Sequence, residues 1–203
     1  MQKESLIEQI IVYEFDMFSK VQSIDGRASC QDDWNTFHIM RFSQHALFSR
    51  ETLQSYKEDL KRAREKGRNL IAEKYSYMME ETDKEYFERE LRPYLTKVGE
   101  RQEKLAKAIA TVFIVCYEGQ SLIYPKLLSS GRSLFGGAGG VTIPCYFVSE
   151  LKTYSENTLL QMARDMIRIL STGENPVKQL YSNIVKEYGY PDLETAERQL
   201  SAG

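Results

Sequence analysis

The ionisable residues Arg41, Lys74 and Glu150 occupy positions where helical spacing predicts burial. A charge that leaves water without a partner costs on the order of several kcal/mol, so each of these residues needs an ion-pair partner, a ligand or a route to solvent. Arginine and lysine bind carboxylates and phosphates, and a carboxylate can exchange protons with a substrate. The three residues therefore predict either a binding site or a buried ion-pair network.

Arg41 shares one face of a predicted helix with Asp33, Phe37, Gln44 and Phe48, because these residues are spaced three or four positions apart. The pattern favours a pocket wall in which Arg41 binds a substrate carboxylate or phosphate through its bidentate fork, while Asp33 and Gln44 orient it. The alternative is a structural ion pair between Asp33 and Arg41 inside a helical bundle.

Lys74 lies near the centre of an apolar helix face that includes Leu70, Ile71, Tyr75 and Met78. As a functional group it would be a second cation for an anionic ligand or, where desolvation lowers the pKa of its amine, a base or nucleophile. The alternative is a lysine whose stem is buried while its amine reaches solvent.

Glu150 comes one helical turn after Tyr146 and one turn before Tyr154, which predicts a carboxylate between two phenols on one helix face. Such a carboxylate can exchange protons with a substrate, so Glu150 and Tyr154 are candidate catalytic residues. The alternative is a core glutamate whose oxygens are satisfied by the two tyrosines.

Cys30 is a third candidate catalytic residue, as a nucleophile just before a predicted helix start. Arg27 and the helix N-terminus favour its thiolate, whereas the aspartates that follow oppose it. A nucleophilic cysteine needs a nearby histidine, and His38 and His45 lie two turns apart on the next helix; a small buried thiol is the alternative. No HxxxH, ExxH or CxxC spacing occurs, so we predict neither a metal site nor a cofactor.

The stretch 129–145 is rich in glycine and strongly resists helix formation, so we expect a long loop. It matches neither phosphate-binding glycine pattern, because Gly137 stands where a Walker motif needs lysine and Thr142 stands where the dinucleotide motif needs glycine. The functional interpretation is a lid that carries Arg132 over a pocket, and the alternative is a plain surface loop.

Hydrophobic periodicity predicts an all-α fold, a single domain over residues 1–203 arranged as an orthogonal helical bundle, with no strands and no internal repeat. The stretch 100–117 becomes apolar almost all round and is the expected centre of the bundle. The expected helices cover 4–22, about 31–48, 49–67, 69–80, 82–92, 100–117, 146–170, 175–189 and a short segment after Pro191.

Composition excludes several classes of protein. Hydrophobic residues make up 42% and charged residues 28%, with a net charge of −2, which argues against disorder and against a nucleic-acid-binding surface. The basic residues Lys57, Lys61, Arg64 and Arg68 alternate with acidic ones and indicate a solvated helix face. The N-terminus lacks a signal-peptide pattern, and the longest apolar run is too short to span a membrane.

Three cysteines without a CxxC pair fit reduced thiols, so we expect a cytoplasmic protein that does not bind membranes. The sequence leaves open whether the protein forms a homo-oligomer.

Three segments resemble motifs of an uncharacterised bacterial family, the domain of unknown function 4125. The segments are RASCQDDWNTFHIMRFSQ (27–44), GRNLIAEKYSYMME (67–80) and LKTYSENTL (151–159). The resemblance implies a bacterial, intracellular, helical protein, and it assigns no activity and no functional residue.

These features favour a metal-independent enzyme that acts on a small anionic metabolite by acid–base chemistry in a polar pocket. Arg41, Lys74 and Glu150 should point inward from three helices. If Asp33 caps its own helix, one of the two cations lacks a partner and is available to an anionic ligand, and this is the case we expect. The alternative function is a noncatalytic ligand-sensing or protein-interaction module, in which the same charges serve structure or recognition.

Overall fold

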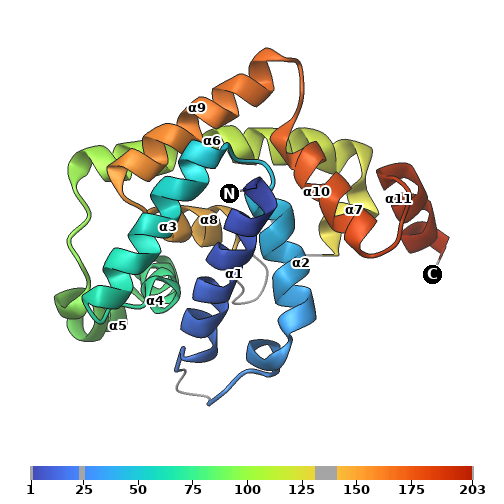
Figure 1. Ribbon diagram of the computed structural model, residues 1–203. Helices are drawn as coiled ribbons and strands as arrows, with labels where there is room; N and C mark the ends of the chain where they lie inside the picture. Colours follow the sequence, from blue (N-terminus) through green and yellow to red (C-terminus); the bar gives the residue numbers. More distant parts are fainter. Residues whose placement is uncertain (1, 23–25, 131–140, 203) are drawn as a thin grey trace.

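The computed structural model describes residues 2–22, 26–130 and 141–202, and every regular element among them is a helix (Figure 1). The predicted all-α fold is therefore confirmed. Most of the glycine-rich stretch, including Arg132, lies outside the described residues.

Four helices form the first half of the chain: α1 (Lys3–Ser19), α2 (Trp34–His45), α3 (Arg50–Glu65) and α4 (Leu70–Thr82), with a 3₁₀ turn, η1 (Ser29–Asp32), before α2. Each start after α1 has a side-chain cap, because Asp33, Ser49 and Asn69 accept hydrogen bonds from backbone N–H groups in the first turns of α2, α3 and α4. Gly67, with a φ of 66°, ends α3 in a left-handed conformation that suits glycine.

The second half repeats this pattern with α6 (Glu100–Ile123), α8 (Ile143–Leu151), α9 (Glu156–Ser171) and α10 (Pro176–Glu187). Thr142, Ser155 and Asn175 cap α8, α9 and α10. Shorter elements join or extend the two halves: α5 (Lys84–Tyr86), the π-helical turn η2 (Phe87–Leu91), the 3₁₀ turn η3 (Arg92–Tyr94), α7 (Pro125–Ser129) and α11 (Leu193–Ala202).

The two halves are related as repeats, so the expectation that the chain has no repeat is wrong. Residues 43–78 align without gaps on residues 149–184, and each residue lies 106 positions from its counterpart. The identical pairs include helix caps, a turn glycine and residues within the helices. They include Ser49 and Ser155, Thr52 and Thr158, Asp59 and Asp165, Arg62 and Arg168, Gly67 and Gly173, Asn69 and Asn175, and Tyr75 and Tyr181.

A reciprocal exchange of hydrogen bonds joins α3 to α9. Asp165 accepts from the Ser49 N–H at 2.7 Å and from Thr52 Oγ1 at 2.6 Å, and Asp59 accepts from the Ser155 N–H at 3.0 Å and from Thr158 Oγ1 at 2.6 Å. The other helices follow the same exchange, since α4 packs against α8 and α2 packs against α10. The repeats are therefore arranged about a pseudo-twofold axis that passes between α3 and α9.

The predicted helix over 146–170 is wrong, because the chain breaks between α8 and α9. Ser155 has an extended backbone and caps α9 by accepting from the Thr158 N–H, while its own N–H is held by Asp59 of α3. The break is thus fixed by a residue of the other repeat.

The centre of the molecule also differs from the prediction. Residues Leu6, Ile7, Ile10 and Ile11 of α1 are at most 1% exposed, so α1 is the most deeply buried helix face. In α6, by contrast, Val115 is 61% exposed, and the expectation that this stretch is buried all round is wrong.

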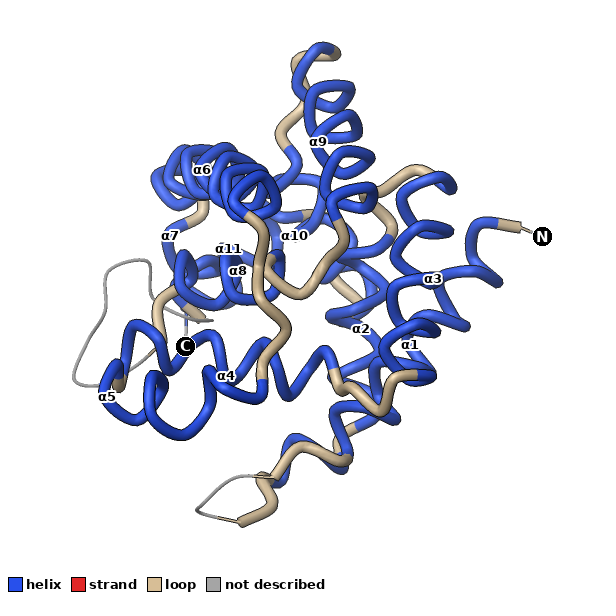
Figure 2. The backbone as a smooth tube through the Cα atoms, turned by 90° about the vertical axis from the view of Figure 1, so that its left-hand side faces the viewer, coloured by secondary structure: helices blue, strands red, loops and turns tan. Residues whose placement is uncertain are grey.

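By length and apolar composition alone, α6 is the one helix of the described residues that could cross a membrane. It runs along one side of the molecule and packs against α8, α9 and α10 (Figure 2), as a helix of a soluble bundle does. The structure is compatible with a soluble protein.

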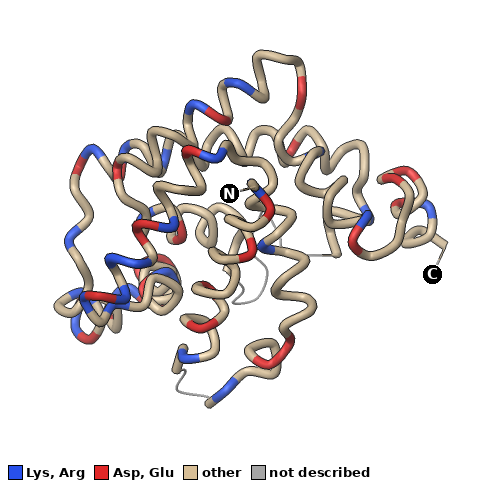
Figure 3. Tube along the Cα trace, viewed as in Figure 1, with Lys and Arg blue, Asp and Glu red and all other residues tan. Residues whose placement is uncertain are grey.

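The outer surfaces of the two repeats carry different side chains. Charged residues crowd α3 and the neighbourhood of α4 and α5, whereas the second half of α6 and α10 have few (Figure 3). Lys61 and Arg64 of α3 correspond to Ile167 and Leu170 of α9, and both apolar residues are exposed. The repeats have therefore kept one fold while their surfaces diverged.

Candidate functional site

A cavity of about 420 Å³ lies between the two repeats, walled by α2 and α4 of the first and by α6, α8, α9 and α10 of the second. Most of its lining is apolar, as ligand pockets commonly are. Polar side chains gather where α2, α4 and α8 meet, and these are Arg41, Gln44, Lys74 and Tyr146.

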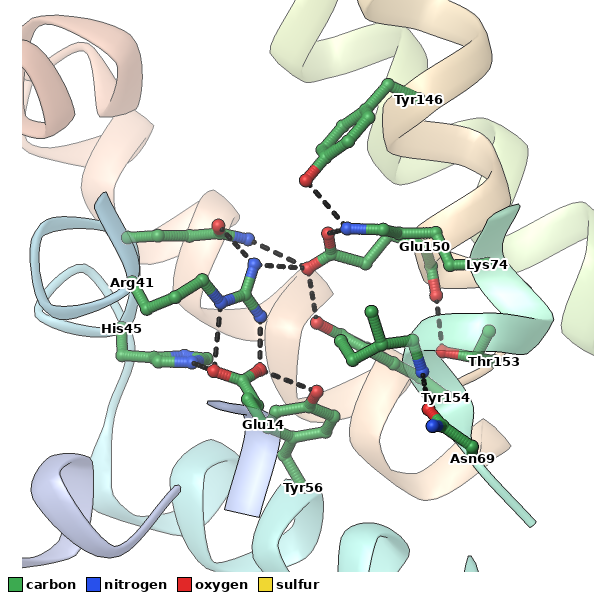
Figure 4. A network of polar contacts seen from close by, with 12 residues as sticks. Glu14, Arg41, His45, Tyr56, Asn69, Lys74, Tyr146, Glu150, Thr153 and Tyr154 are labelled. Atoms are coloured by element: carbon green, nitrogen blue, oxygen red, sulfur yellow. Dashed lines mark hydrogen bonds and ion pairs between the residues drawn. The ribbon is translucent and has the colours of Figure 1, made fainter. Parts of the chain in front are cut away.

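Arg41 is buried and held on several sides by hydrogen bonds (Figure 4). Its Nε donates to Glu14 Oε2 at 2.9 Å, and its Nη2 donates to the other oxygen of Glu14. Its Nη1 donates to Gln44 Oε1 at 2.8 Å and to Glu150 Oε1 at 2.9 Å. The bidentate fork predicted for a ligand is thus occupied by Glu14.

Glu150 collects donors from both repeats. Its Oε1 accepts from Arg41, from Gln44 Nε2 at 3.2 Å and from the Tyr154 hydroxyl at 2.8 Å. Lys74 Nζ donates to Glu150 Oε2 at 3.3 Å and to the Tyr146 hydroxyl at 2.6 Å. The predicted contact with Tyr154 is present although this residue lies beyond the end of α8, and Tyr146 reaches the carboxylate through Lys74.

Glu14 is the member of the network that sequence reasoning missed. It is fully buried on α1, and besides Arg41 it binds His45 Nε2 at 3.0 Å and the Tyr56 hydroxyl at 2.7 Å. Since an ionised carboxylate only accepts hydrogen bonds, His45 donates from Nε2. The signal for Glu14 was present in the sequence, because this residue lies four positions after Ile10 and four before Phe18, within the apolar face.

The charges of the two carboxylates, the guanidinium and the ammonium balance. Glu14 and Glu150 face Arg41 and Lys74, and each of these cations has an ion-pair partner. Asp33 does cap α2, accepting from the Thr36 N–H at 3.0 Å, as expected. The expectation that this leaves one cation unmatched is nevertheless wrong, because Glu14 takes the place that Asp33 would have filled.

The ion pairs hold the network in one ionisation state. Burial alone would raise the pKa of Glu14 and of Glu150. At Glu14 this effect is outweighed by Arg41 and His45, which lower the pKa to about 2. At Glu150 it is outweighed by Arg41 and Lys74, which hold the pKa well below its usual range. Burial would lower the pKa of Lys74, yet Tyr146 and Glu150 raise it above its ordinary value. Burial and Glu150 raise the pKa of Tyr154 well above 10.

The remaining predicted residues are placed as follows. Cys30 is exposed and borders the cavity beside Asp33, whereas Cys116 and Cys145 are buried. His38 Nε2 binds Glu8 at 3.0 Å rather than a thiol. Within the described ranges no three histidine, cysteine or acidic residues come together as metal ligands.

The second repeat carries apolar residues where the first carries the network. Asn69 Nδ2 donates to the Met17 carbonyl and Asn175 Nδ2 to the Cys116 carbonyl, which aligns α1 with α6. The first-repeat residues Glu14, Arg41, His45 and Lys74 correspond to Phe113, Phe147, Leu151 and Leu180. In place of the Glu14–Arg41 ion pair, the rings of Phe113 and Phe147 contact each other with centroids 4.5 Å apart.

A sequence profile of a family described as a protein of unknown function, DUF4125, matches residues 4–198. The chain belongs to this family. No curated protein and no solved structure matches it. The matched range of this DUF4125 chain covers both repeats.

Proposed function

We propose that this protein is a noncatalytic small-molecule-binding module whose ligand occupies the cavity between the two repeats. The observation that carries the proposal is the contrast between the cavity walls. Buried charges form one wall, and at the equivalent positions of the second repeat aromatic and aliphatic residues support the same helix arrangement. Since the second repeat packs the same helix arrangement without ion pairs, the position of the ion pairs beside a cavity supports recognition of a ligand.

The ionisation of the network disfavours the acid–base enzyme. General acid–base catalysis is most efficient when the pKa of the group lies near the working pH. The pKa of Glu150 lies far below neutral and the pKa values of Lys74 and Tyr154 lie above it, so none of the three exchanges protons readily near pH 7. These shifts support a binding role over a catalytic one.

The proposal also includes a place in the cell. The three free cysteines, one of them exposed, fit a reducing compartment, so we place the protein in the bacterial cytoplasm. There it would bind a small metabolite rather than nucleic acid or a membrane.

The test uses the neutral dye Nile red, whose fluorescence rises in apolar surroundings. Leu180 lines the cavity and Ile167 is exposed on α9, so Leu180→Trp fills the site and Ile167→Trp is a control of the same size. We expect saturable binding of one dye per chain in the parent and in the control, and its loss in Leu180→Trp. Equal binding by all three proteins would place the dye elsewhere and overturn the proposal, and steady consumption of a bound metabolite would restore the enzyme hypothesis.

A further inference from the structure

We infer that the ligand of this cavity is an uncharged molecule with an aromatic or other apolar body and one hydrogen-bond acceptor, oriented with the acceptor toward Lys74 and Arg41. This inference rests on the proposed function and deepens it by naming the class of ligand. It departs from the anionic metabolite expected from the sequence.

The positive and negative charges at the polar wall are balanced. Glu14 and Glu150 neutralise Arg41 and Lys74, and all four side chains are nearly inaccessible to solvent. A ligand carboxylate placed beside them would make the site net negative, and it would lie close to Glu150. A ligand ammonium would make it net positive. Because an uncompensated buried charge is strongly unfavourable, an uncharged ligand is favoured.

Lys74 and Arg41 have more N–H groups than their hydrogen bonds use. The Lys74 ammonium has three N–H groups, and hydrogen bonds to Tyr146 and Glu150 use two of them among the described residues. Arg41 has five N–H groups and uses four of them on Glu14, Gln44 and Glu150. Lys74 lines the cavity with its Nζ 4.1 Å from the Tyr146 ring centroid and 5.3 Å from that of Tyr75, and its third N–H is the donor that an acceptor such as a carbonyl oxygen would use.

The rest of the cavity is lined mostly by apolar side chains. Phe113 and Phe147 form a ring pair there, and Met166, Tyr181 and Phe37 complete a surface suited to a flat hydrophobic body. The volume of about 420 Å³ lies within the range typical of pockets for drug-sized molecules, roughly 300–1,000 Å³. The charged wall and the aromatic wall come from equivalent positions of the two repeats, which gives the ligand a defined direction.

The test compares two dyes with the same rings, one neutral and one anionic. Prodan is a neutral aminonaphthalene that carries a ketone, and its analogue with a carboxylate in place of the ketone is an anion with the same rings. We expect Prodan to bind the parent protein at least about tenfold more tightly than the carboxylate dye, a difference of about 1.4 kcal/mol.

A charge variant sharpens the test. Glu150→Gln leaves one positive charge in excess, so the affinity of the carboxylate dye relative to that of Prodan should rise at least about tenfold. Glu187→Gln removes an exposed carboxylate of α10 and should change neither affinity. If Glu150→Gln does not fold, the comparison of the two dyes on the parent protein still decides the matter.

The two proposals fail in different ways. If the carboxylate dye binds the parent as tightly as Prodan, and Leu180→Trp blocks both dyes, the inference about charge is overturned and the binding cavity stands. If neither dye binds the parent, or Leu180→Trp blocks neither, the proposed function falls and the inference falls with it.

Discussion

The two repeats solve the same packing problem in opposite ways. In the first repeat, the ion pair of Glu14 and Arg41 lies between α1 and α2. In the second repeat, the ring pair of Phe113 and Phe147 lies between the equivalent helices, α6 and α8. Burying a charged pair gives up hydration that the attraction between the charges only partly restores, whereas an aromatic pair has no such cost. The comparison shows that this arrangement of helices tolerates either core, so stability alone does not account for the charged one.

What the repeats share is the way their helices begin and end. The Ser-x-x-Thr starts of α3 and α9, the aspartates that bind them and the glycines that follow are the same in both halves. What differs is the set of side chains that face the cavity. Position in the fold is thus fixed by caps and turns, while the cavity walls, like the outer surfaces, differ between the repeats.

The largest effect expected from this comparison is the loss of Glu14. Glu14→Gln leaves Arg41 and Lys74 against Glu150 alone, so a buried positive charge is unmatched, and we expect a loss of about 3–5 kcal/mol in the free energy of unfolding, measured by urea denaturation. The double variant Glu14→Leu with Arg41→Met imitates the apolar second repeat and should lose less than Glu14→Gln. A double variant that is less stable than the single one would show that the first repeat depends on its ion pair for folding.

Acid should destabilise the first repeat through the same carboxylate. The pKa of Glu14 is about 2 in the folded protein against 4.5 ordinarily, so its contribution is complete above pH 4.5 and is lost as the pH falls toward 2. The shift corresponds to about 3 kcal/mol. Urea denaturation at several pH values should show this decline, and in Glu14→Gln the decline should be visibly shallower. An identical pH dependence in both proteins would contradict the assignment.

A smaller effect is expected at the matching position of the second repeat. Phe113→Ala removes a large apolar side chain, but Phe113 already borders a cavity, so we expect a loss of about 2–3 kcal/mol, below the 3–5 typical of a closed core. The variant should also enlarge the site and weaken Nile red binding. A loss above about 4 kcal/mol would indicate that Phe113 is enclosed rather than at a cavity wall.

The smallest effects should be equal in the two repeats. Asp59→Asn and Asp165→Asn each weaken two hydrogen bonds at the start of the opposite helix, and we expect each to cost about 1–2 kcal/mol. Urea denaturation should place the two variants within about 0.5 kcal/mol of each other. A large inequality would break the pseudo-symmetry at the level of energy, even though the geometry is shared.

Much of the site could be predicted from spacing alone. Arg41, Lys74 and Glu150 lie on the apolar sides of their helices, and helical periodicity places them toward the interior, where the structure brings them together. Glu14 follows the same logic, but an acidic residue inside an apolar face is easily taken for its edge. Without Glu14 the charge of the site is miscounted, and an anionic ligand follows from the error.

Other features could not be predicted locally. The break between α8 and α9 depends on Asp59, 96 residues before Ser155, as well as on the local Ser-x-x-Thr cap at Ser155. The repeat was hidden because the buried charged residues of the first half have apolar counterparts in the second, while the identical residues are scattered over caps, one turn glycine and helix positions. Comparing cap positions rather than apolar stripes would have revealed it.

The reciprocal hydrogen bonds between α3 and α9 have a consequence for folding during synthesis. Asp165 follows Ser49 by 116 residues, which a ribosome adding about 5–20 residues per second needs on the order of ten seconds to synthesise. During that interval the first repeat exposes the Ser-x-x-Thr start of α3 and the aspartate Asp59, while the second repeat, which binds both of them, has not yet been made. Another nascent copy on the same messenger RNA carries the same Ser-x-x-Thr start and the same aspartate. We therefore expect swapped pairing between neighbouring nascent chains to compete with correct folding, and slow translation of the second repeat to increase it.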